Sequence, residues 1–113
     1  MNCLFCKIVK KEIPAKIIYE DERVLAFEDV NPQAPAHSLV IPKKHISTSL
    51  DITAEDNELI GHMFQTANKI AQDKNIAGSG FRLVMNCNSD AGQTVFHIHL
   101  HLLGGRIMHW PPG

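Results

Sequence analysis

Residues 96–103 read FHIHLHLL, an unbroken alternation of histidines with apolar residues. Successive side chains of a β-strand point to opposite faces, so His97, His99 and His101 would share one face. We therefore predict a strand over 95–103 whose apolar face packs on the core and whose imidazole face looks toward solvent, a pocket or a partner. The apolar face would carry Phe96, Ile98, Leu100 and Leu102.

The clearest helix signal follows Thr53, a candidate N-cap with Asp56 three residues later. Apolar residues then recur at helical spacing, at Leu59, Ile60, Met63, Phe64, Ala67, Ile70 and Ala71. A short N-terminal helix is predicted over 4–10. Short connections between the predicted strands favour antiparallel pairing. The fold class is α+β, with an antiparallel sheet of about five strands, at 16–20, 23–28, 38–42, 81–86 and 95–103, and one long helix.

The chain has 113 residues, a length typical of a single domain over 1–113. Its formal net charge of -1 provides no general attraction for nucleic acid, and we expect no nucleic-acid partner. No apolar run is long enough for a membrane-spanning helix, so no membrane partner is expected either. The N-terminal residues do not form a signal peptide. These features together predict a cytoplasmic protein.

Three imidazoles on one strand face favour either metal binding or proton and phosphoryl chemistry. Neighbouring alternate residues of a strand lie roughly 7 Å apart, and the outer two of three lie about 13 Å apart. Two such histidines can reach one zinc ion, but all three would have to converge strongly. Histidine also serves as nucleophile, base or acid near neutral pH, because its unperturbed pKa is ~6.5. A polar strand face without chemistry is the remaining alternative.

Cys3 and Cys6 have the Cys-x-x-Cys spacing of half a metal site. The odd number of cysteines argues against a disulfide framework. No thioredoxin-like βαβ pattern surrounds the pair, which weakens a redox role. Two small apolar residues on a short helix are the structural alternative, and Cys87 is expected to be packed without a partner.

Three longer blocks surround these features: NPQAPAHSLVIPKKH over 31–45, VMNCNSDAGQTVFHIHLHLLGGR over 84–106, and MHWPPG over 108–113. With the His-apolar-His-apolar-His-apolar-apolar pattern, they resemble the histidine-triad (HIT) family, in its branch of nucleoside phosphoramidases. The resemblance runs from about Phe5 to Gly113. It implies a HIT-like fold, a sheet that continues across a homodimer, and no organic cofactor.

The resemblance also implies an activity, the hydrolysis of the P–N bond of purine nucleoside 5'-phosphoramidates such as AMP-amines. His99 would be the nucleophile and would form a covalent nucleotidyl-histidine. Covalent catalysis divides one difficult displacement into two easier ones. The resemblance assigns supporting catalytic roles to His101, His97, His37 and Thr94.

The nucleotide itself would be held by residues from several segments. Asp29 matches the ribose-binding carboxylate, and Val30 would lie against the base. The phosphate would be contacted by Gly92, Gln93 and Thr94, where the family more often has serine at the Thr94 position. Further matched contacts are Asn86, His99 and His101, with an apolar lining from Phe5, Ile8, Ile13 and Phe27.

Some microbial relatives in the family complete the cysteine pair with histidines that match His45 and His97, which implies a structural zinc site of Cys3, Cys6, His45 and His97. A zinc-bound His97 would be lost as a proton shuttle, and His101 would then carry more of that work. Three other functions stay open: a nucleotide- or zinc-binding module with little catalysis, a dinucleoside polyphosphate hydrolase or nucleotidyl transferase of the same family, and a zinc hydrolase that uses two of the three alternating histidines. The GGRIMHWPPG ending favours the phosphoramidase branch over the second of these.

Overall fold

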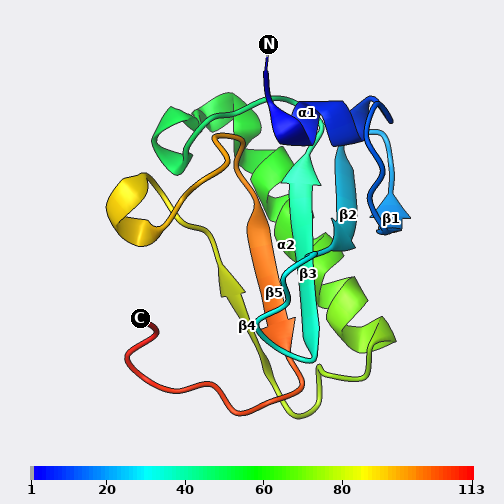
Figure 1. Cartoon of the computed structure of the whole chain (residues 1–113), viewed down its shortest axis with the longest axis vertical. Coiled ribbons are helices and arrows are strands. Elements are labelled where there is room, and N and C mark those ends of the chain that lie inside the picture. Colours follow the sequence, from blue (N-terminus) through cyan, green and yellow to red (C-terminus); the bar gives the residue numbers. More distant parts are fainter. Residues whose placement is uncertain (1) are drawn as a thin grey trace.

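The computed structural model describes residues 2–113 and confirms the α+β class (Figure 1). Three short 3-10 turns accompany the regular elements. In chain order the helices and strands are α1 (Leu4–Val9), β1 (Ile17–Glu20), β2 (Val24–Glu28), β3 (Ala36–Pro42), α2 (Asn57–Asp73), β4 (Phe81–Val84) and β5 (Leu100–Gly104).

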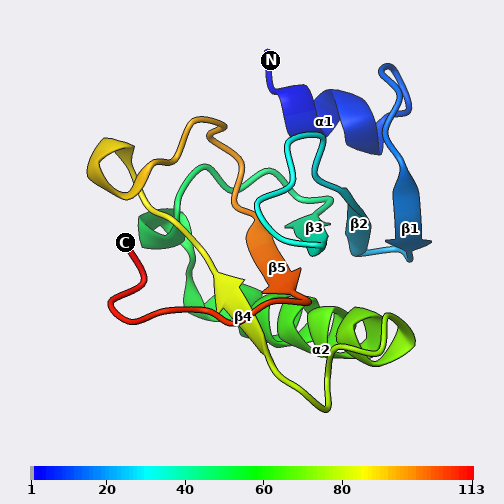
Figure 2. The same ribbon diagram turned by 60° about the horizontal axis from the view of Figure 1, so that its bottom comes forward.

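The five strands form one sheet in the order β1-β2-β3-β5-β4, and every neighbouring pair is antiparallel. The last two strands in the chain therefore pair with each other, and β5 lies between β4 and β3 (Figure 2). In the β3–β5 register, Leu39 lies opposite His101 and His37 lies opposite Leu103. This register places His37 and His101 on the same face, one diagonal step apart.

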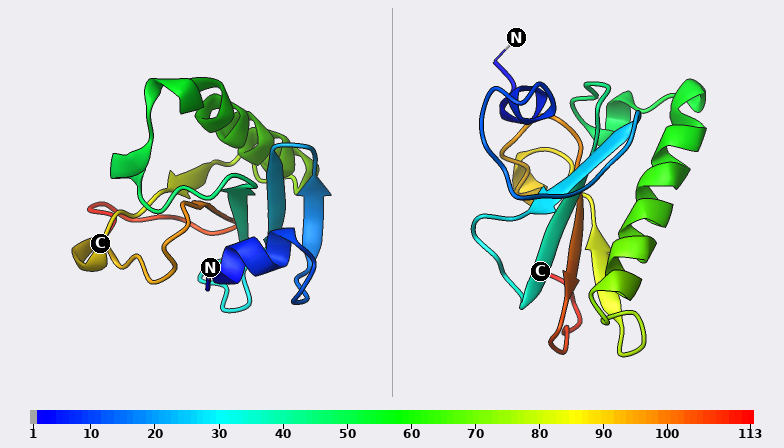
Figure 3. Two further views of the ribbon diagram at one scale, coloured as in Figure 1. Left: turned by 90° about the horizontal axis from the view of Figure 1, so that it is seen from above. Right: turned by 90° about the vertical axis from the view of Figure 1, so that its right-hand side faces the viewer.

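The two faces of the sheet are covered differently (Figure 3). Helix α2 lies along one face, while α1 lies across one end of the other. The α2 side buries even-numbered residues of the strands and of the segment before β5, among them Val24, Ala26, Val40, Ile98, Leu100 and Leu102, against Met63, Ala67, Ile70 and Ala71. The α1 side buries odd-numbered residues, Leu25, Phe27, Leu39 and Ile41, against Phe5 and Ile8.

The predicted strand over 95–103 is too long at its start, because β5 begins at Leu100. Continuing the antiparallel β3–β5 register beyond Val40–Leu100 would set Ile98 opposite Pro42, which has no N–H to donate, and Ile98 pairs instead with the loop that follows β3. The Ile98 N–H donates to the Ile46 carbonyl at 2.7 Å. The alternation nevertheless persists, since Ile98 is buried with the α2-side core.

Other boundaries differ by a few residues. Strand β3 begins at Ala36 rather than 38, and β4 ends at Val84 rather than 86. Thr53 caps a 3-10 turn over Ala54–Asp56, which leads into α2, and the Asp56 carboxylate accepts the Thr53 N–H at 3.0 Å. The capping box was thus predicted correctly, one 3-10 turn ahead of the α-helix.

Two phenylalanines expected in the core lie at the surface instead. Phe64 is 41% exposed and Phe96 is 46% exposed. Thr66 is buried on the core side of α2, where its hydroxyl donates to the His62 carbonyl. Phe96 lies in the bend before β5, outside the pleat that would have directed it inward.

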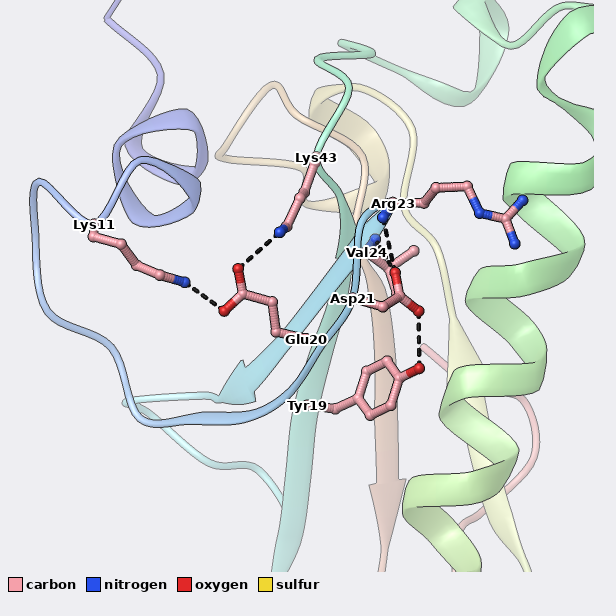
Figure 4. A network of polar contacts seen from close by, with 7 residues as sticks. All are labelled: Lys11, Tyr19, Glu20, Asp21, Arg23, Val24 and Lys43. Carbon is pink, nitrogen blue, oxygen red and sulfur yellow. Dashed lines mark hydrogen bonds and ion pairs between the residues drawn. The ribbon is translucent and has the colours of Figure 1, made fainter.

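The β1–β2 turn is closed by the side chain of Asp21, as Figure 4 shows. Its Oδ1 accepts the main-chain N–H groups of Arg23 and Val24, and its Oδ2 accepts the Tyr19 hydroxyl. His62 on α2 also contacts Asp21 Oδ2, at 2.6 Å. The turn is thereby tied to α2, and His62 is half-buried. Within residues 2–113, no helix is both long and apolar enough to cross a membrane.

Candidate active site

The histidine row lies on the α1 side of the sheet, and it is more buried than the alternation predicted. His97 and His99 are buried, and His101 is half-buried. The cover comes from α1, whose Phe5 ring packs edge-on against the rings of His97 and His99, with centroids 6.0 and 5.1 Å apart. The rings of His97 and His99 are therefore covered by Phe5 and have little contact with solvent.

Hydrogen bonding fixes the proton on His99. Its Nδ1 lies 2.8 Å from the carbonyl oxygen of His97, and a carbonyl can only accept. Nδ1 therefore carries the proton and donates it. The Nε2 atom of His99 is left with a lone pair, which is the form required of a nucleophile or base.

His37 and His101 form a second, connected arrangement with Asp29. The Gln33 N–H donates to His37 Nδ1 at 3.0 Å, so the neutral His37 ring carries its proton on Nε2. That Nε2 lies 2.9 Å from His101 Nδ1 and 3.4 Å from Asp29 Oδ2. The shorter contact makes His101 Nδ1 the acceptor and assigns the His101 proton to its Nε2.

Asp29, His37 and His101 also bring one donor atom each within 4.8 Å of one another, as a metal site would. The proton on His37 Nε2 contradicts that use, because a metal ligand must present a lone pair. Freeing Nε2 would require His37 to give up the Gln33 N–H bond or to become an anion. This group is therefore suited to hydrogen bonding and proton transfer.

A second cluster consists of Cys3, Cys6, His45 and His97. Here a histidine ring does present a lone pair toward the other donor atoms, as a metal ligand must. The Nε2–H of His97 donates to the Pro42 carbonyl at 2.7 Å, which leaves a lone pair on Nδ1. That Nδ1 faces Cys3 Sγ at 3.3 Å, Cys6 Sγ at 3.6 Å and His45 Nδ1 at 3.2 Å. His45 Nδ1 also lies 3.4 Å from Cys6 Sγ.

These distances fit a tetrahedral ion. Zinc–nitrogen bonds of ~2.0–2.1 Å and zinc–sulfur bonds of ~2.3 Å separate neighbouring ligands by about 3.3–3.8 Å. All four donor atoms lie within 4.8 Å of one another. The two facing Nδ1 atoms would repel as lone pairs unless a cation or proton lay between them. The residues could hold a metal ion, and α1 with its N-cap residue Cys3 would supply two of its ligands.

The turn before the histidine row contains Gly92, Gln93 and Thr94. The Gln93 side chain is buried and used within the protein: its Oε1 accepts the Asn88 N–H at 2.8 Å, and its Nε2 donates to the carbonyls of Ser47 and Val95. Gln93 thus braces the turn, whereas Thr94 is exposed next to the row. Gly92 has a φ of +90°, a conformation that favours glycine.

The residues expected around the base and ribose are divided between core and surface. Val30 is 98% exposed and Asp29 is half-buried, with Oδ1 accepting the Asn31 N–H at 2.8 Å. Asn86 is half-buried in the segment after β4. The expected apolar lining belongs to the α1-side core, with Phe5, Ile8 and Phe27 buried and Ile13 packed at its border.

Sequence reasoning missed the main-chain groups that determine the protonation of this site. The carbonyls of Pro42 and His97 and the N–H of Gln33 fix three imidazoles, and every residue type offers such groups. Only the tertiary arrangement could reveal them. Ser47, whose hydroxyl lies 3.2 Å from His45 Nε2, was also missed.

Comparison with known proteins agrees with this geometry. A family model described as scavenger mRNA decapping enzyme C-term binding matches residues 2–109. A protein of Escherichia coli named purine nucleoside phosphoramidase is 50% identical, over 91% of this chain and 87% of its own length. The chain belongs to the histidine-triad family. We refer to His97, His99 and His101 as the triad.

Solved structures of the family superpose closely on this one. A HIT family hydrolase from Legionella pneumophila has a TM-score of 0.98 and 56% identity, covering 99% of this chain and 100% of its own. A HIT family hydrolase from Clostridium thermocellum has a TM-score of 0.93 and 52% identity, covering 96% and 94%. The arrangement of sheet and helices is therefore that of the family.

Burial makes the triad resist protonation. Burial is the largest cause that lowers the pKa values of His97 and His99. Burial, and then the neighbouring His99 and His37, lower the pKa of His101 to about 4. Near neutral pH the triad of the nucleotide-free protein is consequently uncharged.

We expect the free energy of unfolding to fall as the pH drops from 6.5 to 4, because His101 binds a proton in the unfolded chain before it does in the folded one. A displacement to about 4 corresponds to a loss of at most about 3 kcal/mol from this group. Urea unfolding across this range should show a shallower pH dependence in His101→Gln. The exposed His109→Gln serves as control, and equal pH dependence in wild type and His101→Gln would contradict the assignment.

Proposed function

We propose that the protein hydrolyses purine nucleoside 5'-phosphoramidates to a nucleoside monophosphate and an amine through a nucleotidyl intermediate on His99. The observation that carries this proposal is the hydrogen bond from His99 Nδ1–H to the His97 carbonyl, which presents a Nε2 lone pair. The 50% identity to the Escherichia coli purine nucleoside phosphoramidase supports the choice of substrate.

In the first step, His99 Nε2 attacks the α-phosphorus. A P–N bond to the imidazole forms as the P–N bond to the amine breaks, so the two bonds are alike in kind and the intermediate lies near the substrate in energy. The departing amine needs a proton, and His101 supplies it from Nε2. The bound phosphate and the Asp29 carboxylate favour the protonated form of His101, opposing the burial that lowers its pKa in the free protein.

In the second step, water attacks the phosphorus and the bond to His99 breaks. The neutral His101 left by the first step accepts the proton of the water. His37 keeps the His101 ring oriented through the contact between its Nε2 and His101 Nδ1, and the Gln33 N–H in turn orients His37. Thr94, exposed at the edge of the row, provides a hydroxyl for the phosphate or the leaving group.

The nucleoside lies at the Asp29 end of the row. One carboxylate oxygen already accepts the Asn31 N–H, which fixes the group while leaving further lone pairs for the adjacent ribose hydroxyls. The exposed Val30 side chain offers an apolar surface for a purine. Asn86, Gly92 and the main chain around Gln93 complete the nucleotide site in this proposal.

We expect His99→Ala and His99→Asn to abolish turnover of an AMP amide, because each removes the nucleophilic nitrogen. AMP binding should largely survive, since the ribose and base contacts lie elsewhere. Turnover is measured by amine release, and AMP binding is measured by calorimetric titration. A wild type that binds AMP but releases no amine would support a non-catalytic binding module, and an unchanged turnover rate in either variant would rule out His99 as nucleophile.

We also propose that Cys3, Cys6, His45 and His97 hold a structural zinc ion. Two thiolates and two imidazoles are a common tetrahedral zinc set, and a fully protein-bound ion leaves no open position for water. When bound, zinc supplies a cross-link between α1, the loop after β3 and the triad segment. The Cys6 N–H donates to Cys3 Sγ at 3.3 Å, an interaction that suits a thiolate at the start of α1.

Zinc content per chain, measured by plasma emission spectrometry, should be near one for wild type. Cys6→Ser should lose most of the zinc because it removes one of four ligands. Cys87→Ser should retain it, since Cys87 lies outside the cluster. Zinc-free wild type purified from zinc-supplemented cells would contradict the site.

Finally, we propose a homodimer joined along β4. This strand pairs only with β5 among the described residues, so its other edge presents free main-chain groups. Arg82 of β4 holds the C-terminal segment by donating to the His109 carbonyl at 2.9 Å, and Ile107 and Trp110 there are 81% and 82% exposed. Sedimentation should give twice the 12.6 kDa chain mass, and a monomer at micromolar concentration would contradict this arrangement.

A further inference from the structure

His97 takes part both in the Cys/His cluster and in the hydrogen bond that orients His99. Its ring nitrogen Nδ1 is part of the Cys3–Cys6–His45–His97 cluster, while its main-chain carbonyl accepts the proton of His99. We propose that His97 is a positioning residue through which the Cys/His cluster sets the orientation and tautomer of the nucleophile. This inference rests on the phosphoramidase activity and the zinc site proposed above.

The first argument is that the sheet does not hold the nucleophile. Strand β5 begins at Leu100, so neither His97 nor His99 belongs to the β3–β5 ladder, whose last pair is Val40 with Leu100. A segment outside the ladder depends on other contacts to stay in one conformation.

The contacts that replace the ladder converge on the cluster. The His97 ring is held at Nε2 by the Pro42 carbonyl and at Nδ1 by the cluster. The next residue, Ile98, donates its N–H to the carbonyl of Ile46, which directly follows the cluster residue His45. Residues 45–46 and 97–98 are thus joined twice, once through main chain and once through the cluster donors.

Helix α1 reaches the nucleophile through the same cluster. Phe5 lies between the two cysteines in sequence, and its ring packs edge-on against His99 at 5.1 Å, nearly perpendicular. Cross-linking Cys3 and Cys6 to His97 therefore fixes both the carbonyl that orients His99 and the aromatic ring that limits its rotation.

The two ends of the histidine row should respond differently when the Cys/His cluster loses its metal ion or one of its ligands. Asp29 and Val30, which hold the nucleoside in the proposed function, are not cluster residues. Loss of the cluster should therefore disturb the chemical step more than nucleotide binding. A fall in kcat with an unchanged KM indicates the loss of an interaction that is made only in the transition state.

The test compares Cys6→Ser with the matched cysteine control Cys87→Ser, and wild type before and after zinc removal by a chelator. Three quantities are measured: kcat and KM for an AMP amide, the tautomer of His99 from nitrogen-15 histidine spectra, and folding from circular dichroism. Zinc restored to the chelated wild type shows whether the effect is reversible, and it keeps the test valid if Cys6→Ser fails to fold.

We expect Cys6→Ser and zinc-free wild type to lose about tenfold in kcat with KM changed less than about threefold, whereas Cys87→Ser matches wild type. The spectra should show His99 with a fixed proton on Nδ1 in the zinc-loaded protein and exchanging tautomers without zinc. Unchanged kcat and unchanged His99 resonances after zinc removal would overturn the positioning role.

Failure of the proposed activity is distinguishable from failure of this inference. A wild type that hydrolyses no AMP amide would contradict the activity, and the nitrogen-15 spectra would still report whether the cluster controls His99. An active wild type that never binds zinc, with the His99 tautomer already fixed, would overturn the inference while leaving the activity in place.

Discussion

The hydrogen bond from His99 Nδ1–H to the His97 carbonyl organises the site, because it decides which nitrogen of the central histidine is free. A buried imidazole with its lone pair on Nε2 is ready for attack, whereas the opposite tautomer would present a proton. The donor and acceptor are only two residues apart, so the bond requires the main chain at residue 97 to be held in one conformation. Much of the surrounding structure serves that requirement.

Two polar groups lie along the same row and differ in where their protons are. At one end, the Gln33 N–H fixes a proton on His37 Nε2, which makes the Asp29–His37–His101 group a donor chain. At the other end, His97 Nε2–H donates to the Pro42 carbonyl, so its Nδ1 and the two thiols face one another and could hold a metal ion. Similar residue types thus acquire different chemistry from single main-chain contacts.

Burial has an electrostatic consequence for the histidines of both groups. Desolvation disfavours the imidazolium form, and it lowers the pKa of His101 to about 4 in the nucleotide-free protein. In the proposed mechanism an anionic phosphate would oppose that bias, so the charge needed for proton donation would arrive with the substrate. Protonation of His101 would then depend on occupancy of the site.

The sequence alone determined the α+β class, the apolar face of β5 and the alternation that sets His97, His99 and His101 on one side, because periodicity is written in residue types. It also gave the Cys-x-x-Cys spacing. The prediction misplaced the start of β5 and the side chain of Phe96, since a strand end depends on which main-chain groups the neighbouring strand offers. It also misplaced Phe64, since the buried face of α2 includes Thr66 instead. Only the tertiary structure decided the ring tautomers, because they depend on main-chain groups that every residue shares. It also decided the burial of the histidine row, and it brought α1, the Pro42–Ile46 segment and residues 97–99 together.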